Sequence, residues 1–185
     1  MTVAPLPRGT GFQFGEQVKG GAVPRNYIPS VEEGARDALA KGPLGFPVID
    51  LSVVLTDGKY HAVDSSDFAF RTAGRQGLKE ALAKAGPVLL QPVERVDVHI
   101  PSIYSGAMVS LISTLKGQVL GFDRDPECRG WDIFRALLPA SAEEELVAGL
   151  GAATQGTAWH ATSFDHYEEL YGREAERISK NHAAV

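Results

Sequence analysis

The segment GFPVIDLSVVLTDGKYHAVDSSDFAFRTAG, residues 45–74, changes its hydrophobic period once and so predicts a strand, a loop and a helix. Over residues 48–55 apolar side chains, including Ile49, alternate with period two, which is typical of a half-buried strand. A turn at 57–58 follows, and residues 64–66 are all helix-capping types. Small and apolar residues then recur at helical spacing: Phe70, Ala73, Gly77, Leu78, Ala81, Leu82 and Ala85. We expect this helix to pack closely against a sheet.

The residues on either side of this segment predict one more helix and one more strand. Ser30 is followed three positions later by Glu33, the spacing of a capping box, and Gly42 with Pro43 ends the helix. Residues 87–90 are apolar and bounded by prolines, which favours a last strand. We therefore place a domain boundary at residues 91/92.

The second half predicts the order β-α-β-β-α-β, which is the ferredoxin-like arrangement. The expected elements are a strand at 96–100, a helix from 102, strands at 117–122 and 131–138, a helix from 141 and a strand at 156–165. The apolar stripe of the first helix would be Ile103, Ala107, Leu111 and Leu115. Ser141 and Glu144 have capping-box spacing for the second helix.

Composition limits the class of protein and its partners. Of 185 residues 44% are hydrophobic, which suits two small globular domains, and no apolar run approaches the roughly 18 residues of a membrane span. We expect a cytoplasmic protein. Residues 1–93 hold 10 basic and 9 acidic side chains, net +1, whereas residues 94–185 hold 8 and 14, net −6. Neither half has the basic excess that nucleic-acid binding through phosphates requires, so we expect neither DNA nor a membrane as a partner.

The densest polar cluster is DGKYHAVDSSD, residues 57–67. Ser65, His61 and Asp64 leave a Ser-His-Asp hydrolase site as one interpretation, and helix capping by the serines and Asp64 as another. We favour a third interpretation, a loop presented for binding, with His61 as its exposed member. The sequence contains no GxxxxGK[ST], GxSxG, HExxH or CxxC pattern, so we predict that this chain is not an enzyme.

We expect no metal site. His160 and His166 lie close in sequence, but one neighbouring carboxylate and no third histidine favour a packed or solvated role. Cys128 is the only cysteine, which excludes an internal disulfide and a cysteine pair for zinc.

Several segments resemble elongation factor G, the translational GTPase that moves tRNA and mRNA through the ribosome. Those similar to its fourth domain and the following junction are GGAVPRNYIPSVEEG (20–34), residues 45–74 as quoted above, and PVLLQPVERVDVHIP (87–101). Those similar to its fifth domain are YSGAMVSLISTLKGQVLGFD (104–123), ATQG (153–156) and FDHYEEL (164–170).

The resemblance implies an α+β fold in two domains. Residues 1–91 would form an incomplete β-α-β domain with a left-handed crossover, residues 92–170 a ferredoxin-like domain, and residues 171–185 a tail. The family's first strand would be missing, so we expect a truncated chain. Its open sheet edge would pair with residues 1–14 or with another copy, and the protein is otherwise expected to be a monomer.

The resemblance also implies binding to the ribosome. In the family the loop matching residues 57–66 forms the tip of the fourth domain and enters the decoding region, beside the tRNA and mRNA. The tip residues implied to contact RNA are Lys59, Tyr60, His61, Asp64, Ser65 and Ser66. The fifth-domain residues implied to face the ribosome are Lys116, Gln118, Thr154, Gln155 and Gly156.

Some family features lie outside this chain or differ in it. GTP and Mg²⁺ would bind absent domains of a GTPase parent, so no cofactor is expected here. Residues 113–116 and the ATQG segment lack the arginines that the family usually has there. This departure leaves two alternatives open: a paralogue acting in ribosome rescue, recycling or antibiotic protection, or a protein–protein interaction module.

Overall fold

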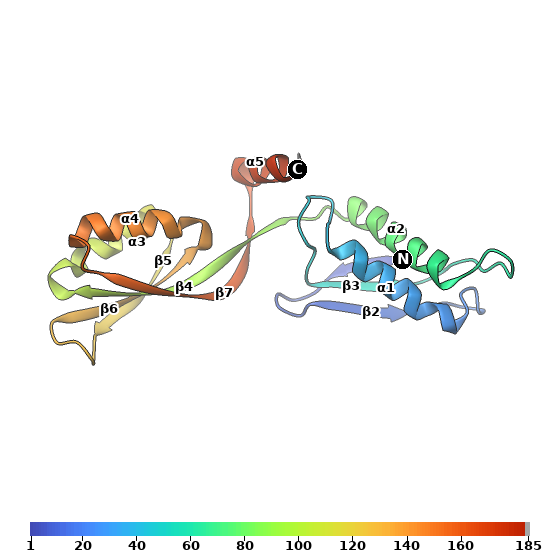
Figure 1. Cartoon of the computed structure of the whole chain (residues 1–185), viewed down its shortest axis with the longest axis horizontal. Coiled ribbons are helices and arrows are strands. Elements are labelled where there is room, and N and C mark those ends of the chain that lie inside the picture. Colours follow the sequence, from blue (N-terminus) through green and yellow to red (C-terminus); the bar gives the residue numbers. More distant parts are fainter. Residues whose placement is uncertain (184–185) are drawn as a thin grey trace. The chain divides into compact units, whose positions relative to one another are not determined.

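The computed structural model describes residues 1–183 and divides into two compact units (Figure 1). Unit 1 comprises Met1–Leu89 together with the segment from Leu170 onward, and unit 2 comprises Leu90–Glu169. These bounds differ from the predicted domains because the last segment of the chain belongs to unit 1. Within the described residues, no helix has the length and apolar character needed to cross a bilayer.

Unit 1 contains a three-stranded sheet in the order β1-β3-β2. Strand β3, Leu51–Leu55, lies in the middle: β1, Thr2–Pro5, pairs with it antiparallel, and β2, Phe12–Glu16, pairs with it parallel. Both neighbours of β3 therefore come from the first 16 residues of the chain. The open sheet edge was expected to pair with residues 1–14 or with another copy, and β1 agrees with the first of these alternatives.

Asp50 fixes the connection between β1 and β2. Its buried carboxylate accepts hydrogen bonds from the backbone N–H of Gly9 (3.1 Å) and Gly11 (2.8 Å), and its φ of 56° lies in the left-handed region. Because Asp50 leaves the extended conformation, β3 begins at Leu51 and not at residue 48 as predicted. Ile49, predicted on the buried face, is correspondingly exposed.

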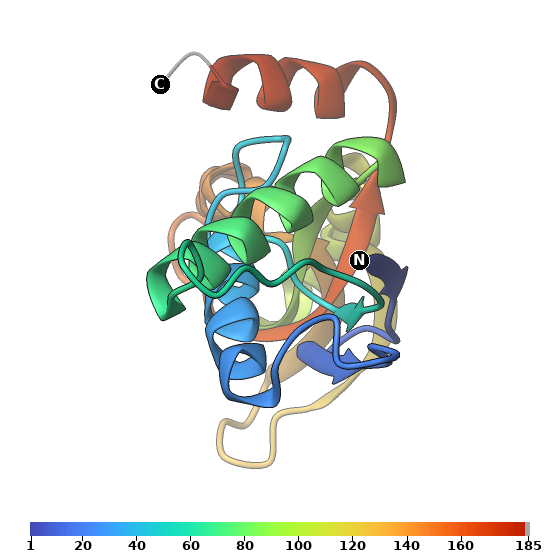
Figure 2. The same cartoon turned by 90° about the vertical axis from the view of Figure 1, so that its right-hand side faces the viewer.

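Two helices cover one face of this sheet, α1, Ile28–Leu39, and α2, Asp67–Ala85 (Figures 1 and 2). A Cβ added at Gly34 would lie 1.9 Å from the carbonyl oxygen of Arg71, and one at Gly74 would lie 2.5 Å from that of Val31. The small residues of α2 were predicted to serve packing on the sheet. The closest backbone approach is instead between the two helices, at these two glycines.

The predicted capping box at Ser30 is wrong, because α1 begins earlier. Its N-cap is Tyr27, which makes no side-chain capping bond, and a proline lies in its first turn. Ser30 is buried within the helix, where its hydroxyl donates a hydrogen bond of 2.7 Å to Asp67 at the start of α2. Ser30, which the sequence predicted to cap its own helix, therefore links α1 to α2.

Unit 2 has the ferredoxin-like order that the sequence predicted. Its sheet runs β5-β6-β4-β7, and β6 pairs antiparallel with both β4 and β5. The elements are β4, Leu89–Pro101, a 3₁₀ helix, Ser102–Ala107, α3, Met108–Thr114, β5, Gln118–Arg124, β6, Trp131–Pro139, a 3₁₀ helix, Ala140–Ala142, α4, Glu143–Thr154, and β7, Trp159–Leu170. The core contains Val98, Ile112, Phe134 and Leu146.

Three predictions for this half are corrected. Residues 87–90 form no separate strand of the first sheet, because the extended chain continues from Leu89 into β4. The α3 stripe is shifted to Met108, Ile112 and Leu115, and Ile103 is 82% exposed, because a 3₁₀ helix precedes α3 and changes the period. The Ser141 capping box is absent, since α4 starts at Glu143 after another 3₁₀ turn and its N-cap makes no side-chain bond.

The final segment, expected as a tail over residues 171–185, forms a helix, α5, Gly172–Ala183. Its His182 ring stacks on Phe46, with 4.0 Å between centroids and 11° between planes. Phe46 lies in the connection between α1 and β3, so this contact is internal to unit 1. Residues 184 and 185 of the predicted tail lie outside the described residues.

Glycine-to-alanine substitutions test the helix contact. Gly34→Ala should lower the free energy of unfolding of unit 1 by about 2 kcal/mol, because the new methyl group would collide with main-chain atoms of α2. Gly151→Ala is the matched control in α4, where nothing lies within 4 Å, and should raise the stability of unit 2 by about 0.5–1 kcal/mol. Amide hydrogen exchange measures the change in the free energy of unfolding of each unit. If the two substitutions changed that free energy equally and in the same direction, the close approach of α1 and α2 would be contradicted.

A buried carboxylate joins β6 to the segment after β4. Asp132 accepts hydrogen bonds from the hydroxyls of Ser105 (2.6 Å) and Ser102 (2.9 Å), and Arg124 lies 3.7 Å away. The Ser105 hydrogen bond, followed by that from Ser102 and the charge of Arg124, lowers the pKa of Asp132 against the opposing effect of burial. The ionised form therefore stabilises the folded unit.

This depressed pKa gives a pH-dependent prediction. Asp132 stabilises unit 2 above its ordinary pKa of about 4, and that contribution is lost as pH falls through the lowered folded value. Asp132→Asn should therefore be less stable than the parent at pH 7, and the difference should shrink below about pH 4. Trp131 and Trp159, the chain's two tryptophans, both lie in unit 2 and report its urea unfolding by fluorescence. A difference that stays constant with pH would refute this role.

Candidate functional site: an exposed loop at the end of unit 1

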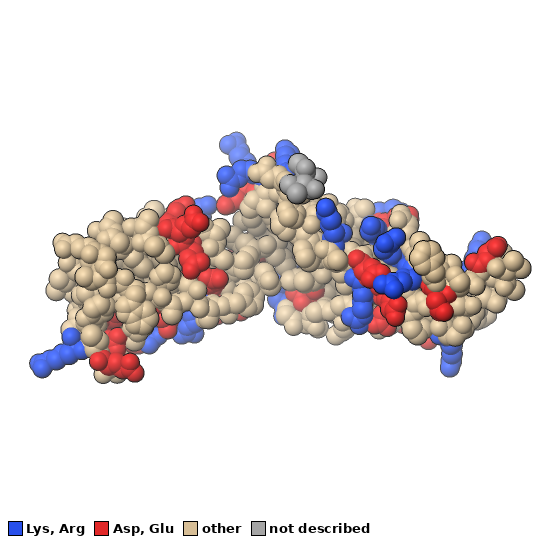
Figure 3. Space-filling model, viewed as in Figure 1, with Lys and Arg blue, Asp and Glu red and all other residues tan. Residues whose placement is uncertain are grey.

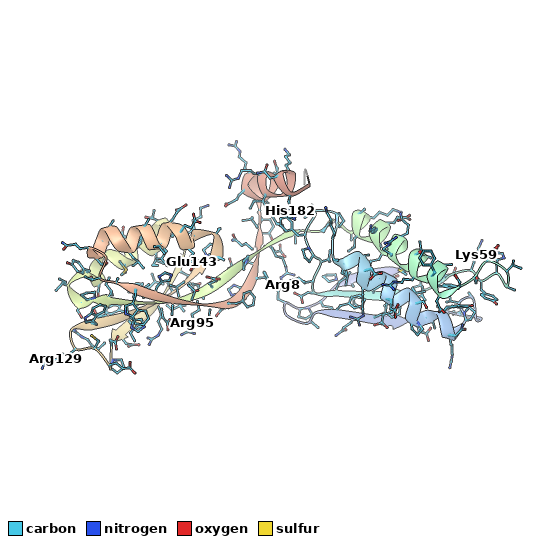
Figure 4. All side chains as sticks on the ribbon, in the orientation of Figure 1. Arg8, Lys59, Arg95, Arg129, Glu143 and His182 are labelled. Carbon is cyan, nitrogen blue, oxygen red and sulfur yellow. The ribbon has the colours of Figure 1, made fainter. Side chains whose placement is uncertain are left out.

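The polar cluster lies in the loop of residues 56–66, between β3 and α2. Figure 4 shows Lys59 at the end of unit 1, beyond the start of α2. All residues of this loop are exposed except Gly58 and Ser65, which are half-buried. The predicted exposure of His61 is confirmed. Since α2 has 19 residues, the loop stands about 28 Å from the other end of that helix.

Reciprocal hydrogen bonds close a turn over residues 61–65. The His61 N–H donates to Ser65 Oγ (3.0 Å), and the Ser65 N–H donates to the His61 carbonyl (3.1 Å). Val63 is 93% exposed at the apex of this turn. The turn therefore keeps a defined shape while its apex remains in solvent.

This geometry argues against the hydrolase interpretation. A serine nucleophile needs a hydrogen bond to its base, but Ser65 Oγ accepts from the backbone of His61. Among residues 1–183, no hydrogen bond joins the His61 ring to Ser65 or Asp64. The cluster thus lacks the contacts of a Ser-His-Asp site.

Ser66 is the residue that caps α2. Its side chain accepts a hydrogen bond of 3.1 Å from the Ala69 N–H, and its backbone is extended. The capping predicted for this group therefore belongs to Ser66, whereas Ser65 closes the turn and Asp64 lies within it. Capping and presentation, which the sequence left as alternatives, occur together in adjacent residues.

Sequence reasoning missed two apolar side chains in and beside this polar loop, Val63 and Phe68. Phe68, in the first turn of α2, is 79% exposed, and Val63 is exposed as well, as is Tyr60, which was among the predicted tip residues. The only signal in the sequence is that large apolar residues interrupt a polar segment. They give the loop non-polar and aromatic surface next to its hydrogen-bonding groups.

The electrostatics of this end are close to neutral. The loop carries Lys59 against Asp57 and Asp64, and acidic and basic side chains are intermixed on the face of unit 1 seen in Figure 3. Such a surface cannot bind RNA mainly through phosphate neutralisation. Shape, stacking and individual hydrogen bonds would have to carry recognition.

The predicted surface of unit 2 is divided between two ends of its sheet. Lys116 and Gln118 lie where β5 begins and β6 ends, whereas Gln155 and Gly156 follow the far end of α4. Figure 4 shows this length of unit 2, with Glu143 at the start of α4 and Arg129 in the hairpin at the opposite end. A single small contact cannot include both groups.

Thr154 is fully buried, unlike the other predicted residues of unit 2. Its hydroxyl donates to the Leu150 carbonyl (2.7 Å) and accepts from the Ala158 N–H (3.2 Å). Gln155 takes the left-handed conformation that ends α4, and the Gly156 N–H bonds back to Gly151. The buried Thr154 side chain therefore helps to end α4 and is inaccessible to a partner. The predicted ribosome-facing residues of unit 2 are reduced to Lys116, Gln118, Gln155 and Gly156.

The histidines of unit 2 have structural partners. Hydrogen bonds to Asp165 and then to Glu168 raise the pKa of His166, and His160 lies 3.7 Å from Glu143. His99 stacks on Trp159, and its hydrogen bond to Asp125 lowers the pKa of that carboxylate. Over the described part of the chain, no cluster of three or more potential metal ligands occurs.

Two family models match the chain in succession. The model described as elongation factor G, domain IV matches residues 1–86, and that of the elongation factor G C-terminus matches residues 88–178. The chain belongs to the elongation factor G family. Within this elongation factor G-like chain, the loop of residues 56–66 lies in the domain IV region and unit 2 lies in the C-terminal region.

Individual relatives agree with this assignment. The chain is 42% identical over 170 residues to an elongation factor G-like protein of Synechocystis sp., a match that covers 92% of this chain and 25% of the relative. A crystal structure from Thermus thermophilus superposes with a TM-score of 0.86 at 32% identity, covering 99% of this chain and 27% of that one. This elongation factor G-like chain thus spans about a quarter of the length of the proteins it matches.

The two serines of the loop should respond differently to substitution. Ser66→Ala removes the cap of α2 and should lower the free energy of unfolding of unit 1 by about 1 kcal/mol, which accelerates exchange of its most protected amides. Ser65→Ala should accelerate exchange mainly at the His61 amide, because only the turn loses its bond. Hydrogen exchange by NMR separates the two. Identical exchange profiles would contradict the assigned roles.

Proposed function

We propose that this chain is the ribosome-binding C-terminal part of an elongation factor G-like translation factor. Its loop of residues 56–66 enters the decoding region of the small subunit while tRNA and mRNA move. The observation that carries the proposal is the exposed, closed turn at residues 61–65, located in the part of the chain that matches domain IV. The action is cytoplasmic, and GTP with Mg²⁺ is bound by other domains of the whole protein.

The loop acts by occupying space and forming hydrogen bonds, without covalent chemistry. A turn that fills the decoding site after the tRNA has left it blocks the return of the tRNA and mRNA. Each 1.4 kcal/mol of difference between the forward and backward states changes their ratio about tenfold. The near-neutral charge of unit 1 suits this role, because a probe that must enter and leave cannot bind phosphates indiscriminately.

A second candidate follows from unit 2. Residues 90–169 hold 5 basic and 12 acidic side chains, net −7, and together with the exposed Trp159 and Phe164 this charge favours contact with a protein surface over contact with rRNA. In that case unit 2 is a protein–protein interaction module. A paralogue that rescues, recycles or protects ribosomes would combine such a module with the same domain IV loop.

A chimera tests the leading proposal. Residues 1–185 replace the matching quarter of the Synechocystis relative, and His61→Ala is introduced. We expect mRNA movement on ribosomes to slow by about tenfold, corresponding to ~1.4 kcal/mol, while GTP hydrolysis is unchanged, because His61 is remote from the nucleotide. His160→Ala, a histidine of unit 2, is the matched control and should leave the rate at the parent value.

The outcomes separate the candidates. If neither His61→Ala nor shortening of residues 60–65 changes the rate, the loop is not the site and the protein–protein module becomes the better account. If the unsubstituted chimera hydrolyses GTP on ribosomes but moves no mRNA, the chain belongs to a factor with another task, such as rescue or recycling.

A further inference from the structure

Three aromatic rings form a column between the core of unit 1 and the loop. Tyr27 stacks on Phe70, with 4.6 Å between centroids and 18° between planes, and faces Tyr60 at 6.1 Å and 29°. Phe70 is buried in a core cluster with Val31 and Leu55, and Tyr27 packs against that cluster. Tyr60 is therefore connected to the core through the Tyr27 ring.

The backbone beside Tyr60 is also held against the body of unit 1. A Cβ added at Gly58 would lie 2.4 Å from Cγ2 of Val23, which is itself buried. A side chain at Gly58 would collide with Val23 unless Val23 moved, so the loop passes close to its support at this position. The first arm of the loop, residues 58–60, consequently rests on residues 23–27.

Tyr27 is itself well fixed. It ends a 3₁₀ turn, Arg25–Tyr27, that is preceded by Pro24, and it is the N-cap residue of α1, with Pro29 close behind. The two prolines restrict the backbone on both sides of the ring. An aromatic side chain held in this way can orient a neighbouring ring without moving itself.

The other arm of the loop is fixed independently. Ser66 caps α2, and the turn at residues 61–65 is closed by its own hydrogen bonds. Because the aromatic column also holds residues 58–60, the turn at residues 61–65 is anchored on both sides. A loop ordered before binding avoids the entropy cost of ordering during binding.

We propose that Tyr27 is a positioning residue, which holds the loop of residues 56–66 in the orientation that enters a short RNA duplex such as paired codon and anticodon. This role rests on the proposed function of the loop. Tyr27 is half-buried in the middle of the column, between Phe70 and Tyr60, so it acts on the loop through Tyr60. Its ring matters and its hydroxyl does not.

Two substitutions at Tyr27 form the test. Tyr27→Leu keeps apolar volume but loses the stack, and Tyr27→Phe keeps the ring. In the 185-residue chain we expect Tyr27→Leu to increase trypsin cleavage after Lys59 and exchange of the His61 amide by about two- to tenfold, the range to which aromatic pair energies correspond. Tyr27→Phe should match the parent. Urea unfolding of the same samples corrects for any change in global stability.

A second variant tests coupling from the loop side. Tyr60→Leu leaves the Tyr27–Phe70 pair in place and should loosen the loop by the same factor. If Tyr27 acts through Tyr60, adding Tyr27→Leu to Tyr60→Leu has no further effect on cleavage after Lys59. Additive effects would show that Tyr27 serves general stability, and would overturn the proposal.

The chimera then connects loop order to movement of mRNA. Tyr27→Leu should slow movement by a factor similar to the increase in loop opening, with Tyr27→Phe restoring the rate and GTP hydrolysis unchanged. If the loop loosens and the rate does not fall while His61→Ala still slows it, Tyr27 has no positioning role and the proposed function stands. If His61→Ala and loop shortening are both without effect, the proposed function itself is wrong.

Discussion

The backbones of α1 and α2 approach so closely at Gly34 and Gly74 that no side chain fits between them. This contact brings the start of one helix beside the start of the other. Ser30 of α1 then reaches Asp67 of α2, and Tyr27 meets Phe70. The loop that precedes α2 is supported only because these two helix ends are adjacent. The geometry of the candidate site therefore depends on the absence of a side chain at Gly34 and at Gly74.

Hydrophobic period was sufficient to predict most elements, because it depends on neighbouring residues alone. The alternation around Val53 and the spacing of Phe70, Leu78 and Leu82 correspond to a buried strand face and a buried helix face. Capping boxes failed at Ser30 and Ser141 because the same spacing also arises inside or before a helix. Only the tertiary partner, such as Asp67 for Ser30, distinguishes these cases.

The candidate site was predictable as a polar loop before a helix, and the ribosomal role proposed for it came from family resemblance. Its support was not predictable, since Tyr27 lies in a segment with no pattern of its own and meets Tyr60 only after folding. The same limit applies to unit 2. Lys116 and Gln155 appear equivalent in sequence, yet the sheet order places them at opposite ends.

The turn at residues 61–65 is closed by main-chain atoms of its two end residues and one serine hydroxyl. Residues 62–64 supply none of those bonds, so folding of the turn hardly constrains their identities. Substitutions at residues 62–64 can therefore change which partner the loop would recognise, while the turn and the helices that support it keep their structure. Such separation makes the apex a natural place for specificity to diverge between paralogues and for an engineer to randomise.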